Sequence, residues 1–347
     1  MYRVHLLPAE YGDSILLEYG DDKRILIDAG TPGSYKAVRK KLESIPKGKR
    51  HFELLVVTHI DADHIGGVIP LLDDAKELGL TFDEIWFNGY KHLIPPSDEL
   101  GEAQAERLTS RIVAGKYNWN TSFAHAVIVP PNGPLPSFDF AGMKITLLSP
   151  KQDQLTKLEK EWTKVITAAG LDPGVGETMT PEEIDDLLGA VDEPVDLDAL
   201  LRVKFKSDTA EANGSSIAFV AEHDEKSVLF GADAFPGVLA ESLARMPEEE
   251  RRRIVAFKLP HHGSRGNLSP ALLDLLDCKT YLISTNGKRF EHPDRESIAR
   301  VIHRAGTPHL VFNYRTDFNK CWDEEDLMHD HDYSVEYGKD GEVTLEV

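Results

Sequence analysis

One arrangement recurs along this chain: a short apolar run ends on an aspartate or a histidine that lies beside a glycine. The run LLVV at residues 54–57 leads into THIDADHIGG at residues 58–67, and KRILIDAG, SVLFGAD and IVAFKLPHHGS have the same form. Apolar runs of this length between turn residues are typical of buried β-strands. The acids and histidines are therefore expected at strand ends, where loops from distant parts of the chain can bring them together.

Strand-like and helix-like patterns alternate along the rest of the sequence. The first sixty residues indicate strands separated by glycine-aspartate turns, and later strands are indicated by AHAVIVPP, MKITLLSP, SSIAFVAE and TYLIST. Helices are expected at residues 68–80, 99–118, 270–276 and 295–305. This alternation predicts an α/β fold with layered sheets and helices.

Residues 151–212 interrupt the strand pattern. Charged residues recur there with helical periodicity, and Thr180-Pro181-Glu182-Glu183 is a helix start signal. We predict a helical insertion over these residues, which lies either over the site as a lid or at the opposite edge as a surface for a protein partner. The tail, residues 310–347, is predicted as a C-terminal extension that ends in a hairpin around Lys339-Asp340-Gly341.

Composition limits the partners and the location of the chain. The formal net charge is −20, from 59 acidic against 39 basic residues, and this mean field repels polyanions. Long duplex nucleic acid is therefore disfavoured, whereas a local cation can still hold a nucleotide or a short strand. Cys278 and Cys321 form no CxxC pair, which favours a reducing compartment. No run has the length of a membrane span and no leader pattern precedes the first strand, so we expect a cytoplasmic protein without a membrane partner.

The stretch THIDADHIGG has the composition of a metal site. It places His59, Asp61, Asp63 and His64 in one loop, and imidazole nitrogen and carboxylate oxygen are ligands that zinc, manganese and iron accept. The glycine pair lets the backbone pass close to the ions. An acidic turn with incidental histidines is the alternative, but HxDxDH followed by two glycines is far more specific than an isolated HxH pair.

A catalytic metal centre needs ligands from other strands as well. Asp28, Asp233, His261 and His262 follow the other apolar runs. A carboxylate such as that of Asp233 can bridge two cations, which lower the pKa of water until a hydroxide exists near neutral pH. Asp233 alone is equally consistent with a turn residue, whereas in combination with the loop and the HHGS stretch it favours a metal centre.

These pieces resemble the metallo-β-lactamase-fold hydrolases and, within them, the soluble relatives of the ComEC-type competence-protein hydrolase domain. The matching pieces occur in the family's order outside residues 151–212 and are GDSILLEYG, KRILIDAG, THIDADHIGG, ITLLSP, NGSSIAFVAE, LFGAD, KLPHHGSRG and HPD at residues 292–294. The resemblance implies one domain over residues 1–347. It also implies an αβ/βα four-layer sandwich with the metal site at one edge of the two sheets.

The resemblance further implies which residues bind the ions. One histidine of the HHGS stretch is a ligand, and we favour His262 for that position and His261 as a group that faces the substrate. Asp28 is implied to orient the ligand loop without binding metal. The implied metal ligands are His59 and Asp61 at one ion, Asp63, His64 and His262 at the other, and Asp233 between them. The implied catalytic residues are Asp63, Asp233 and His261.

Two departures from the family pattern affect the first ion. Many members supply a further histidine before the bridging aspartate, which this chain lacks, and Asp61 stands where a histidine is more usual. The first position is therefore rich in oxygen and short of ligands, which favours manganese or a weakly held second zinc. We expect a divalent metal, Zn or Mn, and leave open whether one or two ions are bound.

Three further residues are expected near the substrate. Asn213 stands where ComEC-like chains carry an asparagine before their serine. Ser264 follows the HHG stretch and can meet a phosphate oxygen, with an ordinary surface contact as the alternative. His292 in FEHPD resembles a residue at the rim of the family's site, with a turn histidine as the alternative.

The ligand set and the resemblance together predict a metal-dependent hydrolase. A phosphodiesterase acting on a nucleotide, a cyclic nucleotide or a short nucleic acid is favoured, because the resembled subgroup is associated with nuclease and phosphoesterase work. Two alternatives are also consistent with the sequence. The same fold can hydrolyse a lactone, a thioester or a lactam, and a chain that holds metal for structure can act as a non-catalytic sensor or partner subunit.

Overall fold

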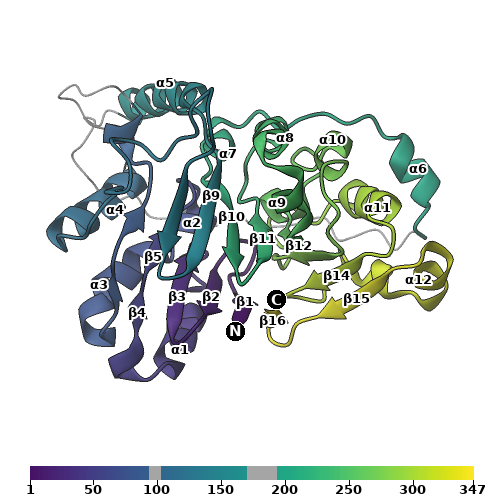
Figure 1. The fold of residues 1–347 in the computed structure, drawn as a ribbon, viewed down its shortest axis with the longest axis horizontal. Coiled ribbons are helices and arrows are strands. Elements are labelled where there is room, and N and C mark those ends of the chain that lie inside the picture. Colours follow the sequence, from purple (N-terminus) through teal and green to yellow (C-terminus); the bar gives the residue numbers. More distant parts are fainter. Residues whose placement is uncertain (94–102, 170–193) are drawn as a thin grey trace.

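The computed structural model describes residues 1–93, 103–169 and 194–347, and two β-sheets form its centre (Figure 1). Among these residues, the first sheet has the strand order β16-β1-β2-β3-β5-β7 and the second has the order β15-β14-β13-β12-β11-β10-β9-β8. Strands β4 and β6 form a separate two-stranded sheet.

The strands of the first sheet are β1 (Tyr2–Leu6), β2 (Ile15–Tyr19), β3 (Lys23–Ile27), β5 (Leu54–Val56), β7 (Ile85–Trp86) and β16 (Val343–Glu346), and the small sheet holds β4 (His51–Phe52) and β6 (Thr81–Phe82). Those of the second sheet are β8 (Ser137–Phe140), β9 (Met143–Ser149), β10 (Ala218–His223), β11 (Lys226–Phe230), β12 (Ile254–Lys258), β13 (Thr280–Ile283), β14 (His309–Phe312) and β15 (Ser334–Tyr337). The helices are α1 (Tyr35–Ser44), α2 (Ala62–Ile65), α3 (Val68–Leu78), α4 (Ala103–Ala114), α5 (Gln152–Ala169), α6 (Leu197–Arg202), α7 (Glu211–Gly214), α8 (Pro236–Arg245), α9 (Glu248–Arg252), α10 (Pro270–Leu273), α11 (Arg295–Arg304) and α12 (Glu325–His331).

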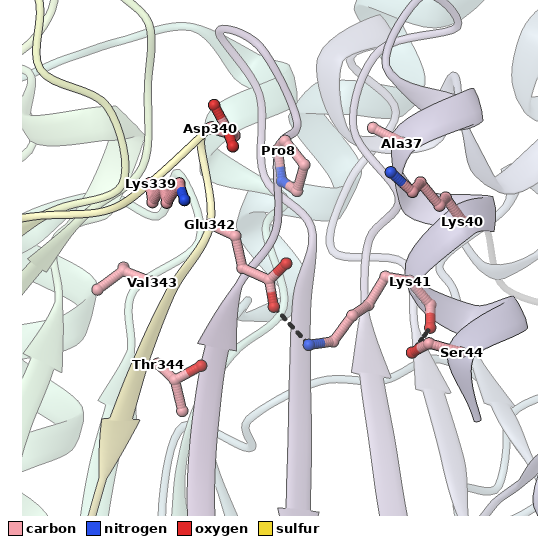
Figure 2. Close-up of a pocket in the computed structure, with 10 residues that line it drawn as sticks. All are labelled: Pro8, Ala37, Lys40, Lys41, Ser44, Lys339, Asp340, Glu342, Val343 and Thr344. Atoms are coloured by element: carbon pink, nitrogen blue, oxygen red, sulfur yellow. Dashed lines mark hydrogen bonds and ion pairs between the residues drawn. The ribbon is translucent and has the colours of Figure 1, made fainter.

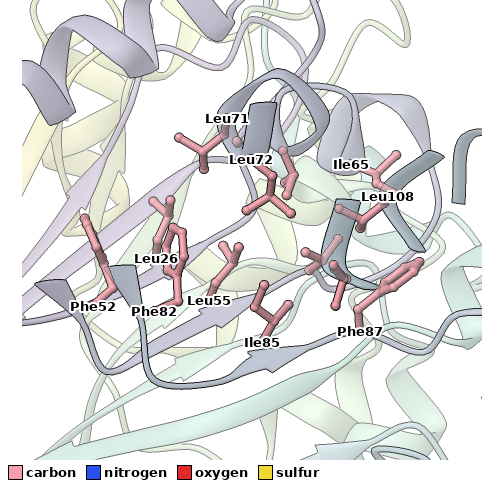
Figure 3. Packing of buried hydrophobic residues seen from close by; sticks show 14 of the residues in the cluster. Leu26, Phe52, Leu55, Ile65, Leu71, Leu72, Phe82, Ile85, Phe87 and Leu108 are labelled. Carbon is pink, nitrogen blue, oxygen red and sulfur yellow. The ribbon is translucent and has the colours of Figure 1, made fainter. Parts of the chain in front are cut away.

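Three buried clusters show how the helices and sheets are layered. Leu55 of the first sheet packs in one cluster with Leu71 of α3, on the face away from the second sheet (Figure 3). Between the two sheets, Val4 belongs to the same cluster as Phe219. Phe257 of the second sheet packs in a third cluster with apolar residues of α8 and α11. The resulting order of helix, sheet, sheet and helix confirms the predicted αβ/βα four-layer α/β fold.

Parallel pairing places the ends of several strands at one edge of the molecule. Strands β3, β5 and β7 are parallel, so the residues that follow them, including Asp28 and Thr58, lie at the same edge of the first sheet. Strands β11, β12 and β13 are parallel in the second sheet. The backbone N–H of Ile217, just before β10, donates to the carbonyl oxygen of Thr58 at 2.9 Å, which joins the two sheets at this edge.

The region predicted as a helical insertion, residues 151–212, contains α5, α6 and the start of α7. The helix start expected at Thr180-Pro181-Glu182-Glu183 lies outside the described residues, as do residues 99–102 of the helix expected at 99–118. Helix α6 contacts α11, and the chain that leaves α6 runs to α7 beside the edge where the motif residues gather. The described end of this region therefore borders the candidate site.

The C-terminal residues 310–347, expected as an extension, supply strands to both sheets. The turn at Asp340 and Gly341 forms, with left-handed φ values of 52° and 81°. The predicted hairpin is nevertheless wrong, because β15 belongs to the second sheet and β16 to the first. A single antiparallel bridge between Lys339 and Glu342 is what remains of it.

The strand expected in AHAVIVPP is also wrong, although Ala126, Val127 and Val129 are buried. Val127 exchanges two hydrogen bonds with the side-chain amide of Asn88, each of 2.9 Å. The N–H of Val129 donates to the carbonyl oxygen of Pro150 at 2.7 Å. A side-chain amide thus satisfies backbone groups that a neighbouring strand would otherwise satisfy.

A polar groove of about 850 Å³ lies between α1 and the turn before β16 (Figure 2). Lys41 of α1 forms an ion pair with Glu342 across this groove. None of the predicted site residues lines it. The described part of the chain contains no helix that is both long and apolar enough to cross a membrane.

Candidate metal centre

Acidic and histidine side chains from both sheets converge at the shared edge. Asp28 follows β3, His59 follows β5, Asp233 follows β11, and His261 and His262 follow β12. Each of these strands is a short apolar run. Residues after the last strand residue no longer pair with a neighbouring strand, so their side chains can point away from the sheet. The chain thereby concentrates its polar groups in one place.

The first group of candidate ligands is His59, His64 and Asp233, whose ligand atoms all lie within 4.8 Å of one another. The Oδ2 atom of Asp233 lies 3.7 Å from Nε2 of His59 and 3.5 Å from Nε2 of His64. Asp61 lies at the same place, with its Oδ2 3.6 Å from Nε2 of His59, and its side chain is 42% exposed. One side of this group therefore opens to solvent.

The second group is Asp63, His64 and His262, again with all ligand atoms within 4.8 Å. The Oδ2 atom of Asp63 lies 3.4 Å from Nε2 of His262, and Oδ2 of Asp233 lies 4.0 Å from the same nitrogen. Because one imidazole nitrogen binds one ion, His64 can serve only one of the two groups. If His64 serves the second group, Asp61 stands with His59 and Asp233 in the first.

The unsatisfied atoms of this cluster provide a test of whether it suits a metal. Among the described residues, Nε2 of His59, His64 and His262 and Oδ1 of Asp233 are buried and have no hydrogen-bond partner. Buried polar atoms are normally bonded, so a cluster of orphaned donors and acceptors requires an explanation. Three imidazole nitrogens and a carboxylate match the ligands that divalent zinc or manganese prefers. The residues present therefore fit a divalent cation.

The other side of each ring is held by the protein. Asp28 accepts from the Thr58 N–H at 2.8 Å, from the Thr58 hydroxyl at 2.7 Å and from Nδ1 of His64 at 2.8 Å. Nδ1 of His262 donates to the carbonyl oxygen of Ser284 at 2.9 Å. A bond at Nδ1 fixes the ring and directs Nε2 toward the centre. Asp28 thus has contacts of the kind that the family resemblance implies for it.

The charges in the cluster shift one another's protonation. Burial opposes ionisation of Asp233, but the neighbouring His64, His261 and His262 lower its pKa well below its usual value. Burial likewise opposes the charged form of His64, yet Asp233 and Asp28 raise its pKa well above its usual value. Asp63, despite its burial, has its pKa lowered to about 2 by His262 and His64. The carboxylates are therefore ionised, as metal ligands must be.

The protonation of His262 predicts how the metal-free protein responds to pH. Burial opposes its charged form, but Asp13 and Asp233 raise its pKa from 6.5 to about 9. A histidine with a raised folded-state pKa contributes stability that is full below about pH 6.5 and is lost as the pH rises through about 9. We expect the melting temperature of chelator-treated protein to fall across this window, measured by calorimetry. Metal-loaded protein should lack this fall, because the cation displaces the proton; a chelated protein with a flat profile would contradict the prediction.

His261 faces the same centre from a polar network. Its Nε2 lies 3.8 Å from Oδ2 of Asp233, and its Nδ1 lies 3.0 Å from Oδ1 of Asn267. Nδ2 of Asn213 lies 3.3 Å from the same Nδ1, and Oδ2 of Asp208 lies 3.7 Å from it. The pKa of His261 is raised, because Asp233 and Asp208 outweigh the effect of burial. The ring is therefore held at one nitrogen and presents the other to the centre.

The backbone of the HHG stretch explains why its two rings diverge. His261 and His262 have left-handed φ values of 47° and 54°. A Cβ atom on Gly263 would lie 2.7 Å from Cβ of Pro293, so only glycine fits beneath the 292–294 loop. This turn sends His262 into the buried centre and leaves the side chain of His261 21% exposed.

A cleft of about 610 Å³ adjoins the centre and collects the remaining predicted residues. Asp61, Asn213, His261, Ser264 and His292 all line it. The hydroxyl of Ser264 accepts from the Gly266 N–H at 3.2 Å, a local contact within its turn. His292 packs against His261 with 5.2 Å between ring centroids, and burial with the adjacent His261 and His262 lowers its pKa to about 3.

Sequence reasoning did not identify three residues that shape the centre. Asp208 accepts from Nδ2 of Asn213 at 2.7 Å and from Nδ2 of Asn267 at 3.0 Å, and so holds the chain before α7 against the HHGS turn. Lys258, 1% exposed, forms an ion pair of 2.7 Å with Asp13, beneath His262. A lysine inside the apolar run IVAFKLP was a signal for such a pair, whereas Asp208 and Asn267 lie in segments without any strand pattern.

Two facing sheets with helices outside them and a histidine-aspartate centre at their common edge define an α/β metallohydrolase. The family model of the metallo-beta-lactamase superfamily matches residues 7–288, and the chain belongs to this superfamily. Its members are mostly metal-dependent hydrolases, and the chain is a member of that class.

Several solved structures are similar to this chain over nearly its whole length. YhfI from Bacillus subtilis, a metallo-beta-lactamase fold protein, is 12% identical, covers 99% of both chains and has a TM-score of 0.42. Zn(2+)-bound PqqB from Methylobacterium extorquens is 11% identical, with 100% of both chains covered and a TM-score of 0.44. A diphosphatase from the PhnP family is 11% identical, covers 100% of this chain and 98% of its own, and has a TM-score of 0.41. These similarities concern no more than the fold, and no curated protein matches the sequence.

Proposed function

We propose that this protein is a metal-dependent phosphodiesterase of the ComEC-like subgroup that acts in the cytoplasm on a nucleotide, a cyclic nucleotide or a short nucleic acid strand. The observation that carries the proposal is the cleft of about 610 Å³, into which Asp61 and His261 of the candidate centre open directly. A substrate bound there lies beside the candidate metal ligands.

One basic side chain of the cleft supports an anionic substrate, although three aspartates line the cleft as well. Lys206 lines the cleft and, among the described residues, is without an ion-pair partner. The carboxylate of Asp208 is already engaged by Asn213, Asn267 and the Ala210 N–H. In a chain whose net charge is −20, an uncompensated lysine at this position offers local attraction for a phosphate group.

The residues of the chain have distinct roles in this proposal. His59 and Asp61 would hold one Zn or Mn ion, Asp63, His64 and His262 a second, and Asp233 would contact both. Bound divalent cations lower the pKa of water and stabilise charge that develops on phosphate oxygens. His261 presents Nε2 to the centre beside the cleft, and from there it could donate a proton to the leaving oxygen. Asn267 and Asp208 keep its ring in position.

The first test combines elemental analysis with hydrolysis of bis(4-nitrophenyl) phosphate, with zinc and with manganese added. We expect bound metal and metal-dependent turnover in the wild type, and loss of both in Asp63→Ala. Asp139→Ala, a change of the same kind in the β8–β9 hairpin, serves as the control and should leave both unchanged.

Other outcomes would replace the proposal. Hydrolysis of chromogenic esters without any hydrolysis of the phosphodiester would indicate a lactone, thioester or lactam substrate. Bound metal without turnover on any substrate would indicate a sensor or partner subunit, in which residues 151–212 would be the first surface to examine for a protein partner.

A further inference from the structure

Phe290 is an exposed aromatic ring at the candidate cleft. The residue is 46% exposed, and it is the only aromatic residue among the large apolar residues that are strongly exposed in the described part of the chain. It lines the same cleft as His261 and His292. Exposure of a ring this large leaves its apolar surface in water, which is unfavourable unless a ligand covers it.

The ring of Phe290 is held in place by its neighbours. Tyr11 meets it edge to face, with 6.4 Å between centroids and an interplanar angle of 88°. His292 lies beside it at 6.0 Å with an angle of 31°. The Arg289 guanidinium lies 5.1 Å from the centroid of Phe290 and 5.5 Å from that of Tyr11. The guanidinium lies over one face of the ring, and these contacts hold Phe290 in place while 46% of the residue stays exposed.

The loop that carries Phe290 is also tied down by hydrogen bonds. The Glu291 N–H donates to the carbonyl oxygen of Gly287 at 2.9 Å, and the Lys288 N–H donates to Oδ1 of Asn286 at 3.0 Å. The Asn286 N–H donates in turn to the carbonyl oxygen of Glu10 at 2.8 Å. A ring on such a loop is preorganised, so little conformational entropy is lost when a planar group stacks on it.

We propose that Phe290 is the platform on which a nucleobase of the substrate stacks. This inference rests on the proposed phosphodiesterase function and assigns the residue that recognises the nucleoside part of its substrate. The phosphate would occupy the part of the cleft lined by His261 and Lys206, and the base would lie on Phe290 beside His292. Stacking on an aromatic side chain is tolerant of base identity, so the site would select for the presence of a base more than for its sequence.

Two esters with the same leaving group test the inference. Thymidine 5′-(4-nitrophenyl phosphate) carries a nucleoside, and methyl 4-nitrophenyl phosphate does not. The quantity measured is the ratio of their kcat/KM values in metal-replete protein. We expect the ratio to favour the thymidine ester in the wild type and to fall about tenfold in Phe290→Ala, as the loss of one stacked base predicts. Phe290→Tyr should keep the wild-type ratio, because the aromatic ring is retained.

A matched control and three further outcomes make the result decisive. Val255→Ala removes another exposed apolar side chain, outside the cleft, and should leave the ratio unchanged. Turnover of both esters with an unchanged ratio in Phe290→Ala would overturn the inference and leave the phosphodiesterase proposal standing. An equal loss of kcat/KM on both esters in Phe290→Ala would indicate that the nitrophenyl ring, and not a nucleobase, lies on Phe290. That result would also overturn the inference. No turnover of either ester would overturn the proposed function itself.

Discussion

Replacement of Asp233 by asparagine is expected to lower phosphodiester turnover by about a thousandfold. Oδ2 of Asp233 lies within 4.0 Å of the free nitrogens of His64 and His262, and its Oδ1 has no partner among the described residues. An amide keeps the shape of the side chain but removes its negative charge and turns donor hydrogens toward the candidate ligands. A loss of about 4 kcal/mol of transition-state stabilisation corresponds to this change in rate.

The measurement is steady-state hydrolysis of bis(4-nitrophenyl) phosphate, with metal content determined on the same samples. Asp224→Asn is the matched control, because Asp224 lies at the opposite end of β11 with its side chain 79% exposed. Circular dichroism should show that both variants fold. A turnover of Asp233→Asn within tenfold of the wild type would show that this carboxylate is not needed at the centre.

Replacement of Lys258 by methionine is expected to destabilise the protein by about 3–5 kcal/mol. Lys258 is 1% exposed and donates to Asp13 at 2.7 Å and to the carbonyl oxygen of Leu259 at 3.1 Å. Methionine has a similar volume, so the main effect is that the buried Asp13 carboxylate loses its cation. The free energy of unfolding is measured by urea denaturation. Its dependence on urea concentration should be the same in the wild type and the variant, because both expose the same surface on unfolding.

Two variants show whether this loss comes from the stranded charge. Lys258→Met combined with Asp13→Asn should recover part of the stability, because no unpaired charge remains. Lys144→Met removes a lysine that is 39% exposed and pairs with Glu250 at 3.3 Å, and it should cost less than about 1 kcal/mol. If Lys258→Met and Lys144→Met lowered the free energy of unfolding equally, burial of the Lys258–Asp13 ion pair would not explain the effect.

The sequence predicted those parts of the fold and site that depend on local pattern. Asp28, Asp233 and His262 each follow an apolar run that forms a strand. Residues that directly follow a strand lie at the edge of its sheet, so their position can be predicted from the run alone. The layered α/β architecture follows from the same runs. The turn at Asp340 and Gly341 could likewise be predicted, because a turn with two successive left-handed residues favours aspartate and glycine at those positions.

The features that the sequence did not predict depend on the path of the chain in space. Asp208 reaches the HHGS turn because the chain leaves α6, which packs on α11, and passes the cleft before α7. Asp13 and Lys258 are separated by 245 positions, so no local pattern links them. Val127 lies in an apolar run that reads as a strand, but Asn88 occupies the place of the neighbouring strand. When a side chain takes over the hydrogen bonds of a neighbouring strand in this way, no periodic pattern in the sequence reveals it.

The pairing of β1 with β16 has a consequence for the protein during its synthesis. Arg3 lies opposite Glu346, and the two residues are 343 positions apart. The ribosome synthesises β1 before the other described strands of both sheets and β16 after them. The nascent chain therefore carries an open strand edge at β1 until β16 has been synthesised, and such an edge recruits other strands. The first sheet can close at β1 only after that point, and until then the edge of β1 is exposed to aggregation.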